Sequence, residues 1–135
     1  MTSRLSSSNK QHKKILFVDD EPDLTFIFKE GLEYAGFSVD AFNNSADALK
    51  NFKPRFYGLV MLDIVMPQMD GFDLYKELKK LDPDVKVCFL TASEKYSEDF
   101  RKEEYRILSK DLFIQKPLSI KDLISEIHKR IGSIE

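Results

Sequence analysis

Cysteine, histidine and long apolar runs are all scarce in this chain of 135 residues, and each scarcity excludes a class of site. The single cysteine, Cys88, allows neither an internal disulfide nor a cysteine metal site, which favours a reducing compartment, and we expect the cytoplasm. His12 and His128 have no partners at the spacing of metal ligands. No apolar run approaches the ~20 residues that span a bilayer, and the first residues lack the apolar core of a secretory signal.

Net charge is also small, because 21 Lys and Arg residues face 23 Asp and Glu residues, which leaves −2 at neutral pH. This balance does not indicate direct binding to nucleic acid. The length fits one domain, which we place at residues 14–132. Residues 1–13 are rich in serine, carry Arg4, Lys10 and Lys13, and have little to bury. We interpret them as a disordered basic tail, either an inert leader or an arm that docks on a partner.

Short apolar runs alternate with segments of helical periodicity along this domain. The expected strands lie at 15–18, 37–42, 57–62, 85–90 and 112–115. The expected helices lie at 22–35, 44–52, 71–81, 96–109 and 120–131. The first helix is expected to bury the face formed by Leu24, Ile27, Phe28, Gly31, Leu32 and Ala35.

Five strands that alternate with five helices predict an α/β fold with a parallel five-stranded sheet. Right-handed crossovers then place helices on both faces, as in a flavodoxin-like, doubly wound (βα)5 sandwich. Its strand order 2-1-3-4-5 has a topological switch point between the first and third strands, at their carboxyl ends. Ligands bind at such a switch point, so the residues that follow these two strands become the candidates for function.

Polar side chains follow four of the expected strands: Asp19 and Asp20, Asp63, Thr91, and Lys116. Three carboxylates at one edge repel, since two like charges ~4 Å apart cost on the order of 4 kcal/mol at an effective dielectric near 20. A divalent cation relieves that repulsion, and oxygen ligands favour Mg²⁺ or Mn²⁺. An aspartate beside a metal and a lysine is a candidate nucleophile toward phosphorus, with Thr91 offering a hydroxyl to a phosphoryl oxygen.

These residues occur in motifs that resemble the receiver domain of two-component response regulators over roughly residues 14–132. The motifs are Asp19-Asp20, Asp63 with Met66-Pro67 and Asp70-Gly71, Thr91-Ala92, and Lys116-Pro117. The resemblance implies that Asp63 accepts a phosphoryl group from the phosphohistidine of a sensor histidine kinase or phosphotransfer protein. It further implies that Mg²⁺ is bound by Asp20, Asp63 and the backbone carbonyl of Val65, and by Asp19 through water. Lys116 would pair with the phosphoryl oxygens.

The resemblance also implies a conformational switch. Thr91 would move toward the phosphoryl group and Phe113 would turn inward, so that the fourth expected helix, the fifth strand and the last helix present a changed surface to a downstream protein target. Ordinary core burial is the alternative interpretation of Phe113. The expected helix 96–109 has the weakest apolar face of the five, which fits a mobile element.

A protein of this kind is not an enzyme beyond its own phosphoryl transfer and slow autodephosphorylation. Val65 and Ser93 flank the route of the hydrolytic water, and an apolar Val65 cannot orient that water, which predicts a long-lived phosphoryl state. We expect a monomer or weak dimer, because Asp111 and scattered charges only partly resemble the pattern of receiver dimers. We expect a stand-alone receiver, although a piece of a longer regulator would have the same sequence.

Three other functions are alternatives to this one. A degenerate receiver that acts only as a protein-interaction module would lack one of the five key residues, and none is missing. An Asp-based phosphatase of the haloacid-dehalogenase type has a second aspartate two residues after the first, where this chain has Val65. A flavin-binding module needs a phosphate loop after the first strand, where Asp19, Asp20 and Glu21 would repel a phosphate.

Overall fold

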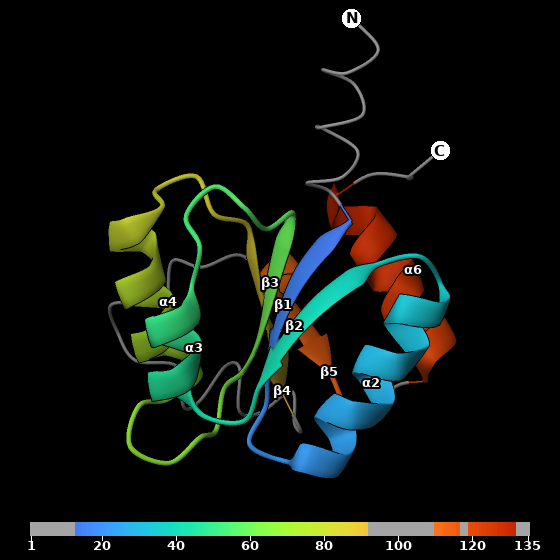
Figure 1. The fold of residues 1–135 in the computed structure, drawn as a ribbon, viewed down its shortest axis with the longest axis horizontal. Helices are drawn as coiled ribbons and strands as arrows, with labels where there is room; N and C mark the ends of the chain where they lie inside the picture. Colours follow the sequence, from blue (N-terminus) through green and yellow to red (C-terminus); the bar gives the residue numbers. More distant parts are fainter. Residues whose placement is uncertain (1–12, 92–109, 117–118, 132–135) are drawn as a thin grey trace, which may run out of the picture.

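The computed structural model describes residues 13–91, 110–116 and 119–131 (Figure 1). They form one five-stranded parallel sheet in the order β2-β1-β3-β4-β5. The strands are β1 (Lys14–Val18), β2 (Ser38–Phe42), β3 (Leu59–Asp63), β4 (Val87–Thr91) and β5 (Phe113–Gln115). The helices are α2 (Pro22–Tyr34), α3 (Ser45–Asn51), α4 (Gly71–Leu81) and α6 (Ile120–Ile131), with a short 3₁₀ turn η2 (Lys110–Leu112) before β5.

Helices cover both faces of the sheet, which confirms the flavodoxin-like, doubly wound architecture (Figure 1). Alternate residues of each strand point to opposite faces. Leu16 and Leu62 therefore pack with α3 and α4, whereas Phe17 and Met61 pack with α2 and α6. Burial on both faces explains why β1, β3 and β4 are nearly continuous apolar runs, whereas the edge strand β2 is only partly buried.

Short polar side chains start three of the helices. Asn44 accepts a hydrogen bond from the backbone N–H of Asp47 at 2.8 Å, and Asp70 accepts one from Asp73 at 2.8 Å. Ser119 likewise accepts one from the N–H of Asp122, in the first turn of α6, at 3.1 Å. These caps satisfy donors that an isolated helix end leaves unpaired, each contributing ~1 kcal/mol.

The buried face of α2 differs from the predicted one. Thr25, Phe28 and Leu32 are buried, but Ile27, expected to face the core, is 56% exposed, so that prediction is wrong. Ala35, also expected to face the core, is exposed as well. At Gly31 an added Cβ would lie 2.5 Å from an isoleucine side chain of α6, so the two helices approach closely there.

Residues 1–12 of the predicted tail 1–13 and the predicted helix at 96–109 lie outside the described residues, as does Pro117. Strand boundaries differ from the predicted ones by one or two residues, as expected for ends that only tertiary hydrogen bonds define. None of the helices in the described part of the chain is both long and apolar enough to cross a membrane.

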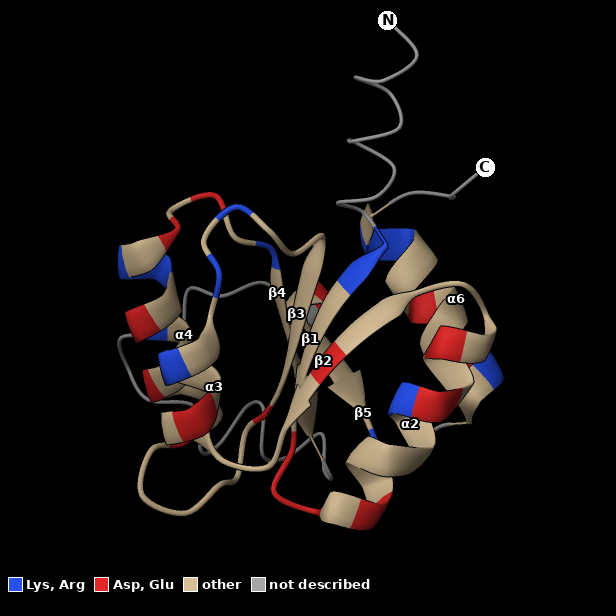
Figure 2. Cartoon of the chain, viewed as in Figure 1, with Lys and Arg blue, Asp and Glu red and all other residues tan. Residues whose placement is uncertain are grey.

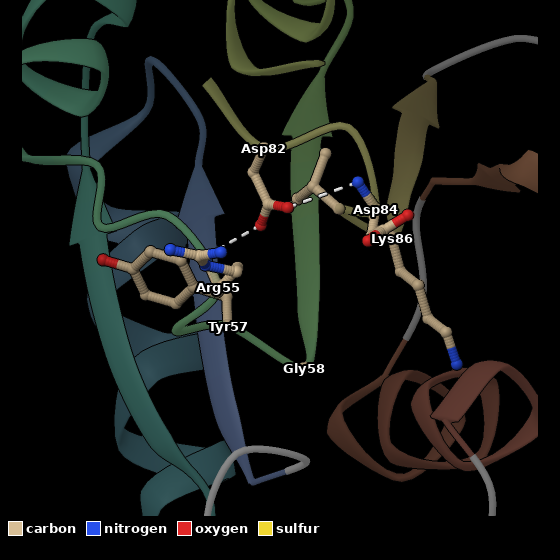
Figure 3. Close-up of a pocket in the computed structure, with 7 residues that line it drawn as sticks. Arg55, Tyr57, Gly58, Asp82, Asp84 and Lys86 are labelled. Atoms are coloured by element: carbon tan, nitrogen blue, oxygen red, sulfur yellow. Dashed lines mark hydrogen bonds between the residues drawn. The ribbon is translucent and has the colours of Figure 1, made fainter. Parts of the chain in front are cut away.

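A buried carboxylate joins two loops at the amino ends of β3 and β4 (Figure 3). The oxygens of Asp82 accept hydrogen bonds from the backbone N–H groups of Arg55 at 2.9 Å and Asp84 at 3.2 Å. Arg55 has a φ of 57°, a left-handed conformation that the bond to Asp82 helps to hold. A hollow of about 400 Å³ lies beside these loops, lined by Arg55, Tyr57, Gly58, Asp82, Asp84, Val85 and Lys86. Asp82 thus fixes the starts of two strands whose other ends carry Asp63 and Thr91.

Candidate functional site

The carboxyl ends of β1, β3, β4 and β5 meet at one edge of the sheet and bring the predicted site residues together. Asp19 directly follows β1, and Asp63 is the last residue of β3. Thr91 ends β4 and is buried, one residue beyond the register partner of Asp63. Lys116 follows β5, and its backbone N–H donates to the carbonyl of Thr91 at 2.6 Å. Figure 2 shows the acidic loop between β1 and α2 at this edge.

Lys116 lies between two carboxylates that come from different strands. Its Nζ donates a hydrogen bond to Oδ2 of Asp19 at 2.5 Å and lies 3.7 Å from Oδ1 of Asp63. Asp19 is fully buried, and its Oδ1 accepts from the backbone N–H of Glu21 at 3.0 Å. Burial lowers the pKa of Lys116, but its hydrogen bond to Asp19 and the nearby carboxylate of Asp63 outweigh that effect and leave the pKa raised. The lysine is therefore a firmly held positive charge.

Asp63 is harder to ionise than an ordinary aspartate. Burial, followed by the charge of Asp19, raises its pKa from 3.8 to about 7, while the charge of Lys116 acts in the opposite direction. Asp20 raises it further through its charge and a side-chain hydrogen bond. One lysine thus does not fully compensate the carboxylates, and an added cation would favour the ionised form.

Three consecutive acidic residues form a group that could hold a metal ion. Carboxylate oxygens of Asp19, Asp20 and Glu21 all lie within 4.8 Å of one another. An all-oxygen donor set of this kind fits a hard cation such as Mg²⁺ or Mn²⁺. Asp63, a predicted ligand, does not belong to this close group of side-chain carboxylates, and the backbone carbonyl of Val65 stays a predicted ligand. Glu21 was not predicted; its only sequence signal was a third acidic residue in the same run.

The loop after Asp63 approaches the start of α4 closely. The N–H of Gly71 donates to the carbonyl of Ile64 at 2.8 Å, and a Cβ added at Gly71 would lie 2.3 Å from the backbone oxygen of Asp63. No side chain larger than hydrogen fits there. The hydroxyl of buried Ser45, which the sequence did not single out, donates to the carbonyl of Met69 at 2.7 Å. These contacts hold the backbone that follows the aspartate.

Comparison with known proteins covers most of the chain. The family model of the response regulator receiver domain matches residues 15–128. The chain belongs to this family. CpdR, a response regulator receiver protein of Brucella abortus, is 32% identical over 122 residues, which cover 88% of this chain and 97% of CpdR.

Solved receiver domains have the same fold. The non-phosphorylated HemR receiver domain of Leptospira biflexa matches with a TM-score of 0.74 at 30% identity, covering 90% of this chain and 96% of that one. TrrA of Thermotoga maritima, solved in complex with Mg²⁺-BeF, matches with a TM-score of 0.69 at 31% identity, covering 86% and 96%. Other relatives are longer, and the chain spans 51% of a probable transcriptional regulator of Cyanidium caldarium.

Phe113, the predicted switch residue of this receiver, is half-buried in an aromatic cluster. Its ring stacks on Phe89 with centroids 5.4 Å apart and meets the edge of Phe72 at 6.2 Å. This packing agrees with core burial in the state described. Its rotation together with Thr91 would require a second state, so the switch stays a prediction.

Replacement of Asp63 by asparagine should stabilise the metal-free receiver at high pH. Because the folded-state pKa of about 7 lies above the usual 3.8, the folded chain binds more protons than the unfolded chain between these values. Wild-type stability contributed by the protonated carboxyl is therefore present at low pH and lost as pH rises through about 7. Since the carboxyl keeps some solvent contact, the expected gain of Asp63→Asn is roughly 1–3 kcal/mol above this pH, and little well below it.

Urea denaturation in the presence of a chelator, followed across pH, measures this difference. Asp84→Asn, which neutralises an exposed aspartate at the opposite edge, is the control and should show no comparable pH dependence. A constant difference between Asp63→Asn and wild type at all pH values would show that the carboxyl of Asp63 is not held protonated by its surroundings.

Proposed function

We propose that this receiver stores a phosphoryl group on Asp63, taken from the phosphohistidine of a sensor histidine kinase or phosphotransfer protein. The observation that carries the proposal is the position of Lys116, which bonds to Asp19 and lies 3.7 Å from the Asp63 carboxylate. A phosphoryl group on that carboxylate would lie next to a cation already held in place. The site residues would be Asp63, Lys116 and Thr91, with Asp19, Asp20, Asp63 and the Val65 carbonyl serving Mg²⁺.

The transfer balances without a further reactant. A carboxylate oxygen of Asp63 forms a bond to phosphorus, and the phosphorus–nitrogen bond of the donor histidine breaks, leaving the electron pair on the imidazole. A bound divalent cation would neutralise part of the negative charge on the phosphoryl group. Lys116 would pair with one phosphoryl oxygen, and the hydroxyl of Thr91 would approach another after a local movement.

The relatives support this proposal at the level of the family. TrrA, 31% identical to this chain, was solved with Mg²⁺-BeF, which supports use of Mg²⁺ here, with Mn²⁺ as the alternative. The Glu21 carboxylate lies close enough to Asp19 and Asp20 to assist in holding the cation. The Thr91 and Phe113 switch would then alter the surface of residues 96–109, β5 and α6 for a downstream protein. The degenerate receiver and the phosphatase are the alternatives that experiment must exclude.

Acetyl phosphate or beryllofluoride added with Mg²⁺ should change the amide NMR spectrum of the wild-type chain around β3, β4 and β5. The change should be absent in Asp63→Asn and in wild type without a divalent cation. An unchanged spectrum of the folded wild-type chain would exclude the phosphoacceptor proposal and favour the degenerate receiver. Continuous release of phosphate, with many turnovers per chain, would favour the phosphatase.

Two large apolar side chains are exposed near the acidic edge. Phe26 is 66% exposed and Ile27 is 56% exposed, both in the first two turns of α2, which begins directly after Glu21. Neighbouring exposed apolar groups mark contact surfaces more often than isolated ones do. Their place in the helix that directly follows the acidic turn fits a contact with the protein that delivers the phosphoryl group.

The double variant Phe26→Ser/Ile27→Ser should slow phosphoryl transfer from the protein donor about tenfold or more and leave labelling by acetyl phosphate unchanged. The loss of apolar contact weakens docking, whereas the chemistry at Asp63 is untouched. The donor is chosen from a panel of autophosphorylated histidine kinases as the one that transfers its phosphoryl group to the wild-type chain fastest. Tyr34→Ser, 97% exposed at the far end of α2, is the matched control. Equal transfer rates for the double variant and Tyr34→Ser would exclude this surface.

Val65 bears on how long the phosphoryl group persists. Its side chain is 52% exposed and carries no hydrogen-bonding atom that could orient a water for hydrolysis. Val65→Asn should therefore lose the phosphoryl group several-fold faster than wild type, measured as decay of ³²P-labelled chain after the donor is removed. Val65→Thr, similar in shape but with a hydroxyl, is the companion variant. Unchanged or slower decay in Val65→Asn would contradict slow, water-limited autodephosphorylation.

A further inference from the structure

Asn43 connects the loop after β2 to the acidic loop after β1. Its side-chain Nδ2 donates to the backbone carbonyl of Asp19 at 2.9 Å and to the hydroxyl oxygen of Thr25 at 2.8 Å. Thr25, only 4% exposed, donates its own hydroxyl hydrogen to the carbonyl of Pro22 at 2.9 Å. Hydrogen bonds therefore hold the acidic turn between β1 and α2 on both of its sides.

The two acceptors determine the orientation of the Asn43 amide. A backbone carbonyl can only accept, so the group that faces Asp19 is the NH₂ and not the amide oxygen. Thr25 already donates to Pro22, so its oxygen is free to accept the second N–H of the same nitrogen. Aspartate at this position would place an acceptor against the Asp19 carbonyl, and alanine would leave both acceptors without this donor.

This network completes the polar contacts of Asp19. Its backbone N–H donates to the carbonyl of Phe42 at 3.1 Å, and its carboxylate accepts from Glu21 and Lys116. With its carbonyl bonded to Asn43, each polar atom of Asp19 has a partner. Because the residue is fully buried, each bond restricts where the carboxylate can lie.

We propose that Asn43 is a positioning residue for the cation site, an inference that rests on the proposed Mg²⁺-dependent function. Through Asp19 and Thr25 it holds the acidic turn so that the carboxylates of Asp19, Asp20 and Glu21 converge within 4.8 Å. Like charges at that separation repel, and a turn without cross-links relieves the repulsion by opening. Asn43 opposes this opening without adding a charge of its own.

The neighbouring Asn44 provides a matched control. Its side chain accepts from the N–H of Asp47 at 2.8 Å and donates to the Asp47 carboxylate at 2.9 Å, so it caps α3. Both bonds stay within the first turn of that helix. Asn44→Ala therefore removes the same side chain and weakens a helix end, but leaves the contacts of Asp19 in place.

Titration calorimetry of the metal-free full chain with Mg²⁺ alone, at mildly alkaline pH, tests the proposal without any phosphoryl donor. Asn43→Ala should bind Mg²⁺ roughly tenfold more weakly than wild type, the lower end of what loss of a supporting contact costs. Asn44→Ala should bind like wild type. Thr25→Val, which removes the hydroxyl at similar volume, should weaken binding, and Thr25→Ser, which retains the hydroxyl, should restore it.

Amide hydrogen exchange in the metal-free protein gives a second readout. The N–H of Glu21 donates to Asp19 and should exchange faster in Asn43→Ala than in Asn44→Ala. Unchanged Mg²⁺ affinity in Asn43→Ala, or an equal loss in Asn44→Ala, overturns the positioning role alone. Equal Mg²⁺ affinity of Thr25→Val and Thr25→Ser also overturns the positioning role. This comparison tests the role even if Asn43→Ala does not fold. A wild-type chain that binds no Mg²⁺ overturns the proposed function and this inference with it.

Discussion

The ion pairs of Lys116 are the interaction on which the arrangement at the carboxyl edge depends. The lysine side chain is mostly buried between Asp19 and Asp63, which come from strands β1 and β3. Removal of one partner from a buried pair typically costs about 3–5 kcal/mol, because the remaining charge is left without compensation. Burial first, and then the charges of Asp19 and Asp20, keep the pKa of Asp63 raised to about 7 despite this lysine. The carboxylates of Asp19, Asp20 and Asp63 outnumber Lys116 at this edge and leave an excess of negative charge. That excess is what makes a further cation fit.

The parallel sheet is what allows one lysine to reach both carboxylates. All strands end at the same edge, so residues far apart in sequence become neighbours there without any local signal. At the amino ends of the strands, buried Asp82 joins the loops that precede β3 and β4 and so fixes where these two strands begin. Between the two edges the strands are buried on both faces, which leaves little freedom to slide. Rigid strands therefore position the site, while its polar contacts adjust only locally.

The sequence predicted those parts of the structure that a single strand or helix determines. Apolar runs that stop at a polar residue located the strands, and their alternation with helices predicted a parallel sheet. The order 2-1-3-4-5 came from the flavodoxin-like fold that this alternation indicates, and it places Asp63 and Lys116 at one edge. Tertiary contacts decided the rest. Helical periodicity placed Ile27 inside, but Thr25 is buried instead, with its hydroxyl bonded to Asn43 from the loop after β2. Glu21 has the sequence pattern of an acidic residue at a helix start, which does not distinguish it as a metal ligand. The hydrogen bond from Asn43 to Asp19 joins residues 24 positions apart, and no sequence motif predicts it.

The position of Lys116 also limits how the proposed signal could leave the site. Its backbone N–H is bonded to Thr91, and Phe113, three residues earlier, stacks on Phe89 of β4. A phosphoryl group on Asp63 would draw the lysine from Asp19, and this shift would be transmitted to β4 and β5 through those two contacts. One rearranged hydrogen bond to a charged group contributes about 1.5–3 kcal/mol, whereas a nearly complete change of state needs ~5.5 kcal/mol. Lys116 alone would therefore not complete the proposed switch, and a full response would require Thr91 and the aromatic cluster to favour the same state.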